Sequence, residues 1–181
     1  MKKLLLVLAS AWLAGCAGDQ TPGKPQDATA FFKPDFDKIC AAWSTLDASK
    51  AAPFYAKDPN LAFFDVTPLQ YKGWQEYEDG FKQATANYKS LEVTLEPDFR
   101  AMQLGNIAWA TYTVDLVVQP KTGDIVKQQG RGTDVLEKRG ERWLIVHEHV
   151  SVPMAQEQQP KAKAHKARLS SHQKAAKKRR K

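Results

Sequence analysis

The sequence predicts an α+β domain in which amino-terminal helices cover one face of a curved antiparallel sheet. Apolar residues at helical spacing are confined to the first part of the region 31–154. Four long segments rich in β-branched and aromatic residues follow, and turn residues separate them. This region has the size of one compact domain, so we expect a single domain between two ends of different composition.

The first helix is expected to begin at Pro34-Asp35, where the aspartate can cap it, and to run to about Lys50. A short second helix is predicted over residues 52–55, because Pro53 suits a first helical turn. A third is predicted from Gly73 or Trp74 to about Tyr88. The spacing that predicts the first and third helices is carried by Phe36, Ile39, Cys40, Trp43 and Leu46, and by Tyr77, Phe81, Ala84 and Tyr88.

A short strand is predicted over residues 61–65, between Asp58-Pro59-Asn60 and Pro68. The four later strands are expected at residues 90–104, 107–119, 124–138 and 142–152. Their turns are predicted at Gly105-Asn106, Lys121-Thr122-Gly123 and Arg139-Gly140.

Several strings within this region resemble one known family. They are TLDASKAAPFYAKDPNLAFFD, PLQYKGWQEYEDGF, GTDVLEKRGERW and WLIVHEHVSVP. They are similar to the SnoaL-like branch of the nuclear transport factor 2-like superfamily, and the last is also similar to the association domain of calmodulin-dependent protein kinases. The resemblance implies a cone-shaped fold with a cavity between the helices and the concave sheet face. That superfamily contains isomerases, cyclases, dehydratases and oligomerisation modules, so the fold does not choose the function.

The implied cavity has suitable lining in the sequence, although aromatic side chains also dominate ordinary cores. The kinase association domains carry arginines where this chain has Asp134 and Val150, so anion binding there is not implied. The residues expected in the pocket are Trp43, Tyr55, Phe64, Tyr71, Trp74, Tyr112, Asp134 and Glu148.

The stretch RWLIVHEHVSVP places two histidines two residues apart in a predicted strand. Side chains two apart share a face of a strand, so Trp143, His147 and His149 are expected together. We expect Glu148 on the opposite face, projecting into the cavity, and the Trp143 side at a dimer interface. The reversed assignment, with both histidines facing the cavity, stays open because alternation does not label the faces. No metal site is expected, since a third ligand is not evident.

Catalysis of the ketosteroid isomerase type would require a carboxylate base in an apolar pocket and hydrogen-bond donors for an oxyanion. The candidate bases are Asp65, Asp134 and Glu148, but the catalytic set of such enzymes is not matched residue by residue. We therefore predict a domain that binds a small apolar ligand or a protein partner, without established catalysis and without a cofactor. The alternative is an isomerase or lyase. Cys40 is interpreted as a buried apolar residue.

The amino-terminal end has the pattern of an exported lipoprotein. Residues 1–15 have two lysines, an apolar run and small residues, which is typical of a signal peptide. Leu13-Ala14-Gly15-Cys16 resembles the lipobox, which implies that Cys16 is lipidated and holds the protein to a bacterial membrane. Ala17 after the cysteine favours the outer membrane, facing the periplasm, in a Gram-negative host. Residues 16–30 are expected to form a flexible tether.

The carboxy-terminal residues 155–181 are expected to form a disordered basic tail. Residues 156–181 hold ten Lys and Arg residues and one acid, so they carry a net charge of +9 in a chain of net +7. Such a segment suits attachment to anionic lipid or polymer, and a solvated tail without a dedicated partner is the alternative.

Overall fold

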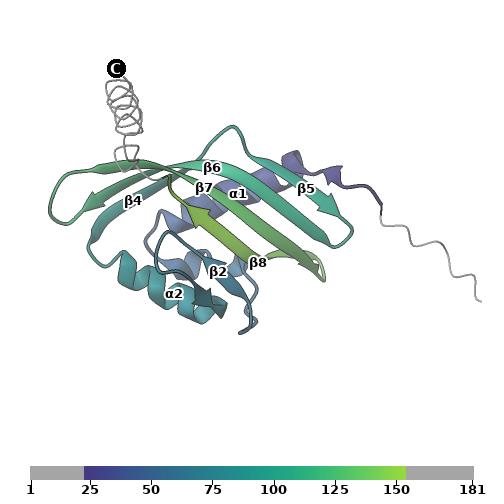
Figure 1. The fold of residues 1–181 in the computed structure, drawn as a ribbon, viewed down its shortest axis with the longest axis horizontal. Helices are drawn as coiled ribbons and strands as arrows, with labels where there is room; N and C mark the ends of the chain where they lie inside the picture. The colour runs from purple at the N-terminus through teal and green to yellow at the C-terminus, as the bar shows by residue number, and fades with distance from the viewer. Residues whose placement is uncertain (1–22, 154–181) are drawn as a thin grey trace, which may run out of the picture.

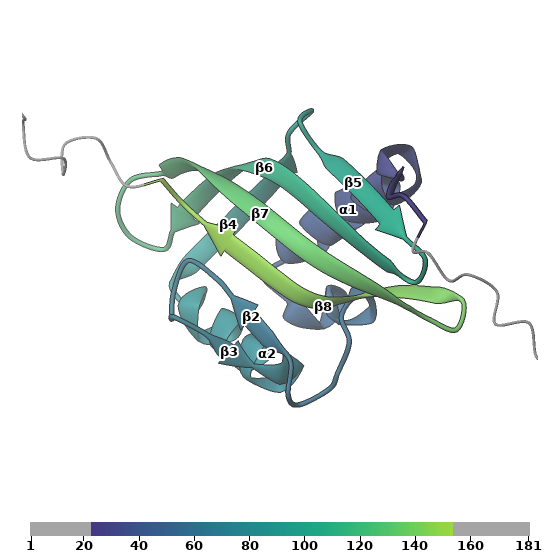
Figure 2. The same ribbon diagram turned by 45° about the vertical axis from the view of Figure 1, so that its right-hand side comes forward.

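Two α-helices lie on the same side of a curved eight-stranded sheet in the computed structural model (Figures 1 and 2), which describes residues 23–153. The helices are α1 (Thr29–Trp43) and α2 (Gly73–Ala84), with two 3-10 helices, η1 (Ala48–Lys50) and η2 (Ala52–Phe54), between them. The strands are β1 (Gln26–Asp27), β2 (Ala62–Phe64), β3 (Tyr71–Lys72), β4 (Tyr88–Leu95), β5 (Arg100–Leu104), β6 (Ile107–Pro120), β7 (Val126–Arg139) and β8 (Arg142–Ser151).

The strand order is β1-β5-β6-β7-β8-β2-β3, and β4 also pairs with β6. The predicted α+β class is confirmed, but the sheet is mixed because β2 pairs with β8 in parallel. The short helix predicted over residues 52–55 is present as η2. The residues predicted to form the signal peptide, the lipidated Cys16 and the basic tail lie outside the described residues. The end of the predicted flexible tether is instead structured, because β1 pairs with β5 and α1 begins at Thr29.

The segment expected as one strand over residues 90–104 forms two strands, β4 and β5. Both pair with β6: β5 pairs with the first half of β6, and β4 pairs with its second half. Pro97 lies between them and has no N–H to donate to a ladder. The Asp98 carboxylate accepts a hydrogen bond from the N–H of Thr113 at this break.

Helix α1 begins five residues before the predicted Pro34-Asp35 start. The Thr29 N–H donates to the Asp27 carboxylate, and the Thr29 hydroxyl bonds the backbone of Ala101 on β5. Pro34 therefore lies inside the helix. It is tolerated because Pro34 and Ala30 are both exposed, so water can satisfy the Ala30 carbonyl that lacks a helical donor.

The two α-helices also end earlier than their periodicity suggests. Helix α1 ends at Trp43 because the Ser44 and Thr45 hydroxyls bond the carbonyls of its last turn and Leu46 takes a φ of 60°. Leu46, expected on the apolar face, thus lies outside the helix. Helix α2 ends at Ala84, where the Thr85 hydroxyl bonds the Phe81 carbonyl, and β4 starts at Tyr88.

Small side chains on the inner sheet face let α1 pack closely. Ala101, Ala108 and Ala110 have no exposed surface, and Phe32 and Phe36 of α1 belong to the same buried cluster. The remaining inner face, toward the outer ends of β4 and β6, carries larger aliphatic residues.

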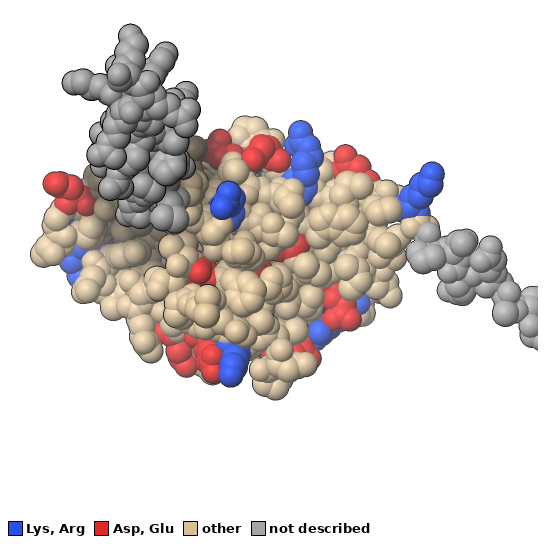
Figure 3. All heavy atoms as spheres, in the orientation of Figure 1, with Lys and Arg blue, Asp and Glu red and all other residues tan. Residues whose placement is uncertain are grey.

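Charged side chains lie mainly around the margin of the face drawn in Figure 3. Residues 23–153 contain 15 basic and 18 acidic residues, so the net positive charge of the chain comes from its ends. No helix in this part of the chain is long and apolar enough to cross a membrane.

Candidate functional site

A cavity of about 340 Å³ lies between the helices and the inner face of the sheet. Helix α1 contributes Ile39 and Trp43, and α2 contributes Tyr77 and Phe81. The sheet contributes mainly aliphatic side chains of β4 and β6. This volume suits a small molecule, and a few polar groups in an apolar wall are typical of ligand sites.

Glu148 is the carboxyl group at the inner end of this cavity. It lies on β8, opposite Asp134 of β7 and Phe63 of β2, and is 3% exposed. A register shift at β8, where Val135 pairs with His147 and Leu136 with Ile145, precedes it. Glu148 therefore faces the cavity, while His147 and His149 lie on the opposite, open face of the sheet.

Two tyrosine hydroxyls hold the Glu148 carboxylate. The Tyr55 hydroxyl donates to Oε2 at 2.5 Å, and the Tyr77 hydroxyl donates to Oε1. The Trp43 indole N–H donates to the Tyr55 oxygen at 3.1 Å, so that the Tyr55 proton is directed at Glu148. Each carboxylate oxygen thus has a donor, and further hydrogen bonds from a ligand can reach its remaining lone pairs.

Asp134 is a second buried carboxyl group next to Glu148. It is 0% exposed, and its Oδ1 accepts a 3.2 Å bond from the Tyr112 hydroxyl, while Oδ2 has no partner within the described residues. Tyr112 reaches it by lying over Gly132, where an added Cβ would overlap the tyrosine ring. Glu148 has two phenol donors, and none of the buried residues described is Lys, Arg or His. We therefore infer that Glu148 ionises before Asp134, which stays neutral.

Burial dominates the ionisation of these groups. It raises the pKa of Glu148 to about 7, against the lowering effect of the Tyr55 and Tyr77 hydrogen bonds. Burial, followed by the Glu148 charge, raises the pKa of Asp134 well above its usual range. Burial likewise raises the pKa of all three tyrosines, Tyr55, Tyr77 and Tyr112.

Asp65, the third candidate base, lies at the cavity wall just after β2. Burial raises its pKa, although it accepts a hydrogen bond from the Val66 N–H at 2.6 Å. The structure therefore brings Asp65 and Glu148 to one cavity, with Asp134 directly behind Glu148.

The other residues predicted to line the pocket lie in three different environments. Trp43 and Tyr112 line the cavity. Tyr55, Tyr71 and Trp74 are buried in the aromatic core beside it, where Tyr55 contacts Glu148 and Tyr71 stacks on Tyr77. Phe64 does not belong to the pocket: its neighbour Phe63 faces the core, and the Phe64 ring packs edge-on against His147 and His149.

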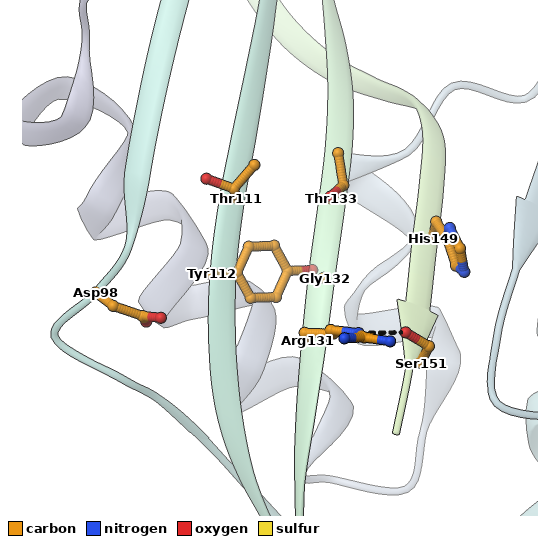
Figure 4. A pocket seen from close by; sticks show the side chains of 8 residues that line it. All are labelled: Asp98, Thr111, Tyr112, Arg131, Gly132, Thr133, His149 and Ser151. Carbon is orange, nitrogen blue, oxygen red and sulfur yellow. Dashed lines mark hydrogen bonds between the residues drawn. The ribbon is translucent and has the colours of Figure 1, made fainter. Parts of the chain in front are cut away.

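Trp143 does not share a face with the two histidines, contrary to the alternation of the sequence. The register shift after Ile145 reverses the parity of β8, so Trp143 contacts Phe32 and Ile145 is fully buried. On the open face, His147 Nδ1 is 2.7 Å from the Ala62 carbonyl. Figure 4 shows His149 there with Thr133, Arg131 and Ser151 around a shallow polar hollow.

Neither the histidines nor Cys40 forms a metal site in the described part of the chain, where no three His, Cys, Asp or Glu side chains are close enough to hold an ion. Cys40 lines the cavity, and burial raises the pKa of its thiol to about 12. It is therefore an unreactive apolar lining residue.

Tyr77 was not among the predicted site residues, although it donates directly to Glu148. The signal was present: the helical spacing of α2 buries Tyr77, and a buried tyrosine hydroxyl needs a partner. The identity of that partner depends on β8, which is 71 residues away.

Comparisons with known proteins agree with this architecture. The model of a family described as a SnoaL-like domain matches residues 30–155. No curated protein matches the sequence. Among solved structures, a nuclear transport factor 2-like superfamily protein from Salmonella enterica serovar Typhimurium LT2 has 19% identity and a TM-score of 0.61, over 71% of this chain and 96% of that chain.

Two further structures have names that suggest different roles. A protein of Streptomyces avermitilis, provisionally named a dehydratase of the NTF2-like family, has 15% identity and a TM-score of 0.60, over 70% of this chain and 96% of its own. A protein of Xanthomonas campestris, provisionally named a calcium/calmodulin-dependent protein kinase II association domain, has 24% identity and a TM-score of 0.51, over 68% and 86%. At these identities the likeness concerns the fold alone.

Proposed function

Because the chain belongs to the SnoaL-like domain family, whose members share a scaffold but not a function, we propose from its own cavity that it binds a small, largely apolar molecule with one polar group. The observation that carries the proposal is Glu148, a nearly buried carboxylate at the inner end of an apolar cavity of about 340 Å³. An apolar wall supplies affinity, and a single oriented polar group fixes the position of the ligand.

The proposal is tested with 1-naphthol, a neutral fluorescent probe with one hydroxyl. We expect it to bind the protein and to change the fluorescence of Trp43, which lines the cavity. Glu148→Gln should weaken binding by about tenfold or more, because a hydrogen bond to a charged group is lost.

The matched control is Glu92→Gln, which changes an exposed glutamate of β4 and should leave affinity unchanged. Equal affinity of the native protein and the Glu148 variant would contradict the proposed site.

A second function, proton transfer on an apolar carbonyl compound as in an isomerase or lyase, is favoured by one observation. The pKa of Glu148 is raised to about 7, which suits a general base at neutral pH. The geometry also argues against it, because the hydroxyls of Tyr55, Tyr77 and Tyr112 are already directed at carboxyl groups and do not face a developing oxyanion. We therefore rank binding first.

Exchange of α-hydrogens of an apolar cyclic ketone in deuterated water, followed by NMR, separates the two functions. A binding protein leaves the exchange rate at its uncatalysed value. Catalysed exchange that is lost in both Glu148→Gln and Glu148→Ala would establish the enzyme instead.

We also propose that this domain works outside the cytoplasm, held to a membrane through Cys16 and assisted by the basic residues 156–181. The support is in the sequence: the lipobox-like Leu13-Ala14-Gly15-Cys16 and a net charge of +9 at the other end. A lipid chain together with a basic segment is a two-signal attachment that is stronger than either alone.

A further inference from the structure

The outer part of the cavity wall is a continuous aliphatic strip. Val114, Leu116 and Val118 alternate on the inner face of β6, and Val93 and Leu91 of β4 pair with Leu116 and Val118. Side chains of this row are spaced two residues apart, so Val114 to Val118 spans roughly 13 Å. The strip is therefore a long apolar surface, with no polar side chain along its β6 row.

The two ends of this strip differ. Its inner end meets Glu148 and Tyr112. Its outer end reaches Val126, which pairs with Val118 and is 47% exposed, and Val66, also 47% exposed, lines the same cavity. A ligand with one polar end can thus place that end against Glu148 while its apolar part follows β6 toward the rim.

The charge of the cavity lining determines which polar group a ligand can place next to Glu148. Asp65 and Glu148 are the ionisable carboxyl groups of the wall, and its described residues include no Lys, Arg or His. A carboxylate or phosphate ligand would place a second negative charge in a low-dielectric site without a cation, which is costly. A head group that donates a hydrogen bond complements the Glu148 oxygens.

We propose that the ligand is an unbranched aliphatic alcohol or amine, with its hydroxyl or amino group on Glu148 and its chain along the strip. This inference rests on the proposed function and specifies the chemical class of its ligand. Aliphatic acids of the same length should bind more weakly because of the negative charge of the wall.

The test uses titration calorimetry on residues 16–181. It measures the binding of 1-alkanols and 1-aminoalkanes of about six to about twelve carbons. Affinity should rise about three- to fourfold for each added methylene until the strip is filled. The alkanoates of equal length should bind at least tenfold more weakly, and the longer alkanols should displace 1-naphthol. The alcohol and amine arms identify which donor the site prefers.

Two variants of β6 provide a matched pair. Leu116→Trp narrows the strip and should remove the gain for long chains while short chains still bind. Val117→Trp changes the adjacent residue on the open face and should leave the length dependence intact.

Affinity that is independent of chain length, or alkanoates that bind as well as alkanols, would overturn this inference. If 1-naphthol still binds in a Glu148-dependent way in that case, the proposed function stands. Absence of binding by every probe contradicts both.

Discussion

At the scale of single residues, the chemistry of the site depends on the different hydrogen bonds that two buried carboxyl groups accept. Glu148 receives two tyrosine donors, whereas Asp134 receives one longer bond and leaves Oδ2 without a partner among the described residues. The sequence indicated both as candidate bases but not this inequality. It arises because Tyr55 and Tyr77, from separate elements, converge on one carboxylate.

Replacement of Asp134 by asparagine should stabilise the protein increasingly as the pH rises. The folded pKa of Asp134 lies above its unfolded value, so the folded state keeps a proton that the unfolded state releases above about pH 4. The contribution of Asp134 to wild-type stability therefore falls as pH rises through this window, whereas Asp134→Asn lacks this titration. The difference should grow by up to about 1.4 kcal/mol per pH unit.

Urea unfolding at about pH 4, 5.5 and 7 measures this difference. Asp124→Asn, in the exposed turn between β6 and β7, is the control and should show no such trend. A stability difference between Asp134→Asn and wild type that is constant with pH would contradict a neutral Asp134.

At the scale of elements, long-range pairing overrides local signals at several boundaries. The proline that predicted the start of the first helix lies inside α1, because Asp27 and the β5 backbone extend the helix backward. The β8 alternation reverses at a register shift, so Trp143 lies on the helix-covered side and His147 on the open side. Neither a bulge nor a β5 partner has a signature within a few neighbouring residues.

Pro34→Ala should raise the free energy of unfolding by about 1–3 kcal/mol. The substitution supplies an N–H for the Ala30 carbonyl and removes the proline penalty of a helix interior. Chemical denaturation measures the change, with Lys38→Ala on the same exposed surface as a control near zero. An unchanged or lowered stability would contradict the destabilising effect assigned to Pro34 inside α1.

At the scale of the whole molecule, the helices and the inner sheet face make one cavity, while the opposite face of the sheet bears the histidines. Dimerisation through that open face stays a prediction. So do export and membrane attachment, whose signals lie outside residues 23–153.

Membrane attachment should respond separately to its two proposed signals. Cys16→Ser should move the exported protein from the membrane fraction to the soluble fraction, because no acyl chain is added. Deletion of residues 161–181 should weaken binding to vesicles that contain phosphatidylglycerol, most strongly at low salt, and should not alter binding to neutral vesicles. Salt-independent binding after the deletion, equal to that of the intact chain, would remove the role proposed for these residues.

The order of helices before long strands and the α+β class followed from the sequence, because apolar periodicity reports which side of an element is buried. The sequence favoured Glu148 toward the cavity but left the reversed assignment open, and the structure decided between them. Only the tertiary structure decided that Tyr77 meets Glu148, that Phe64 and Trp143 leave their expected sides, and that Asp134 is sealed behind Tyr112 and Gly132. These outcomes depend on register and on contacts between elements many residues apart, and a local pattern carries no record of either.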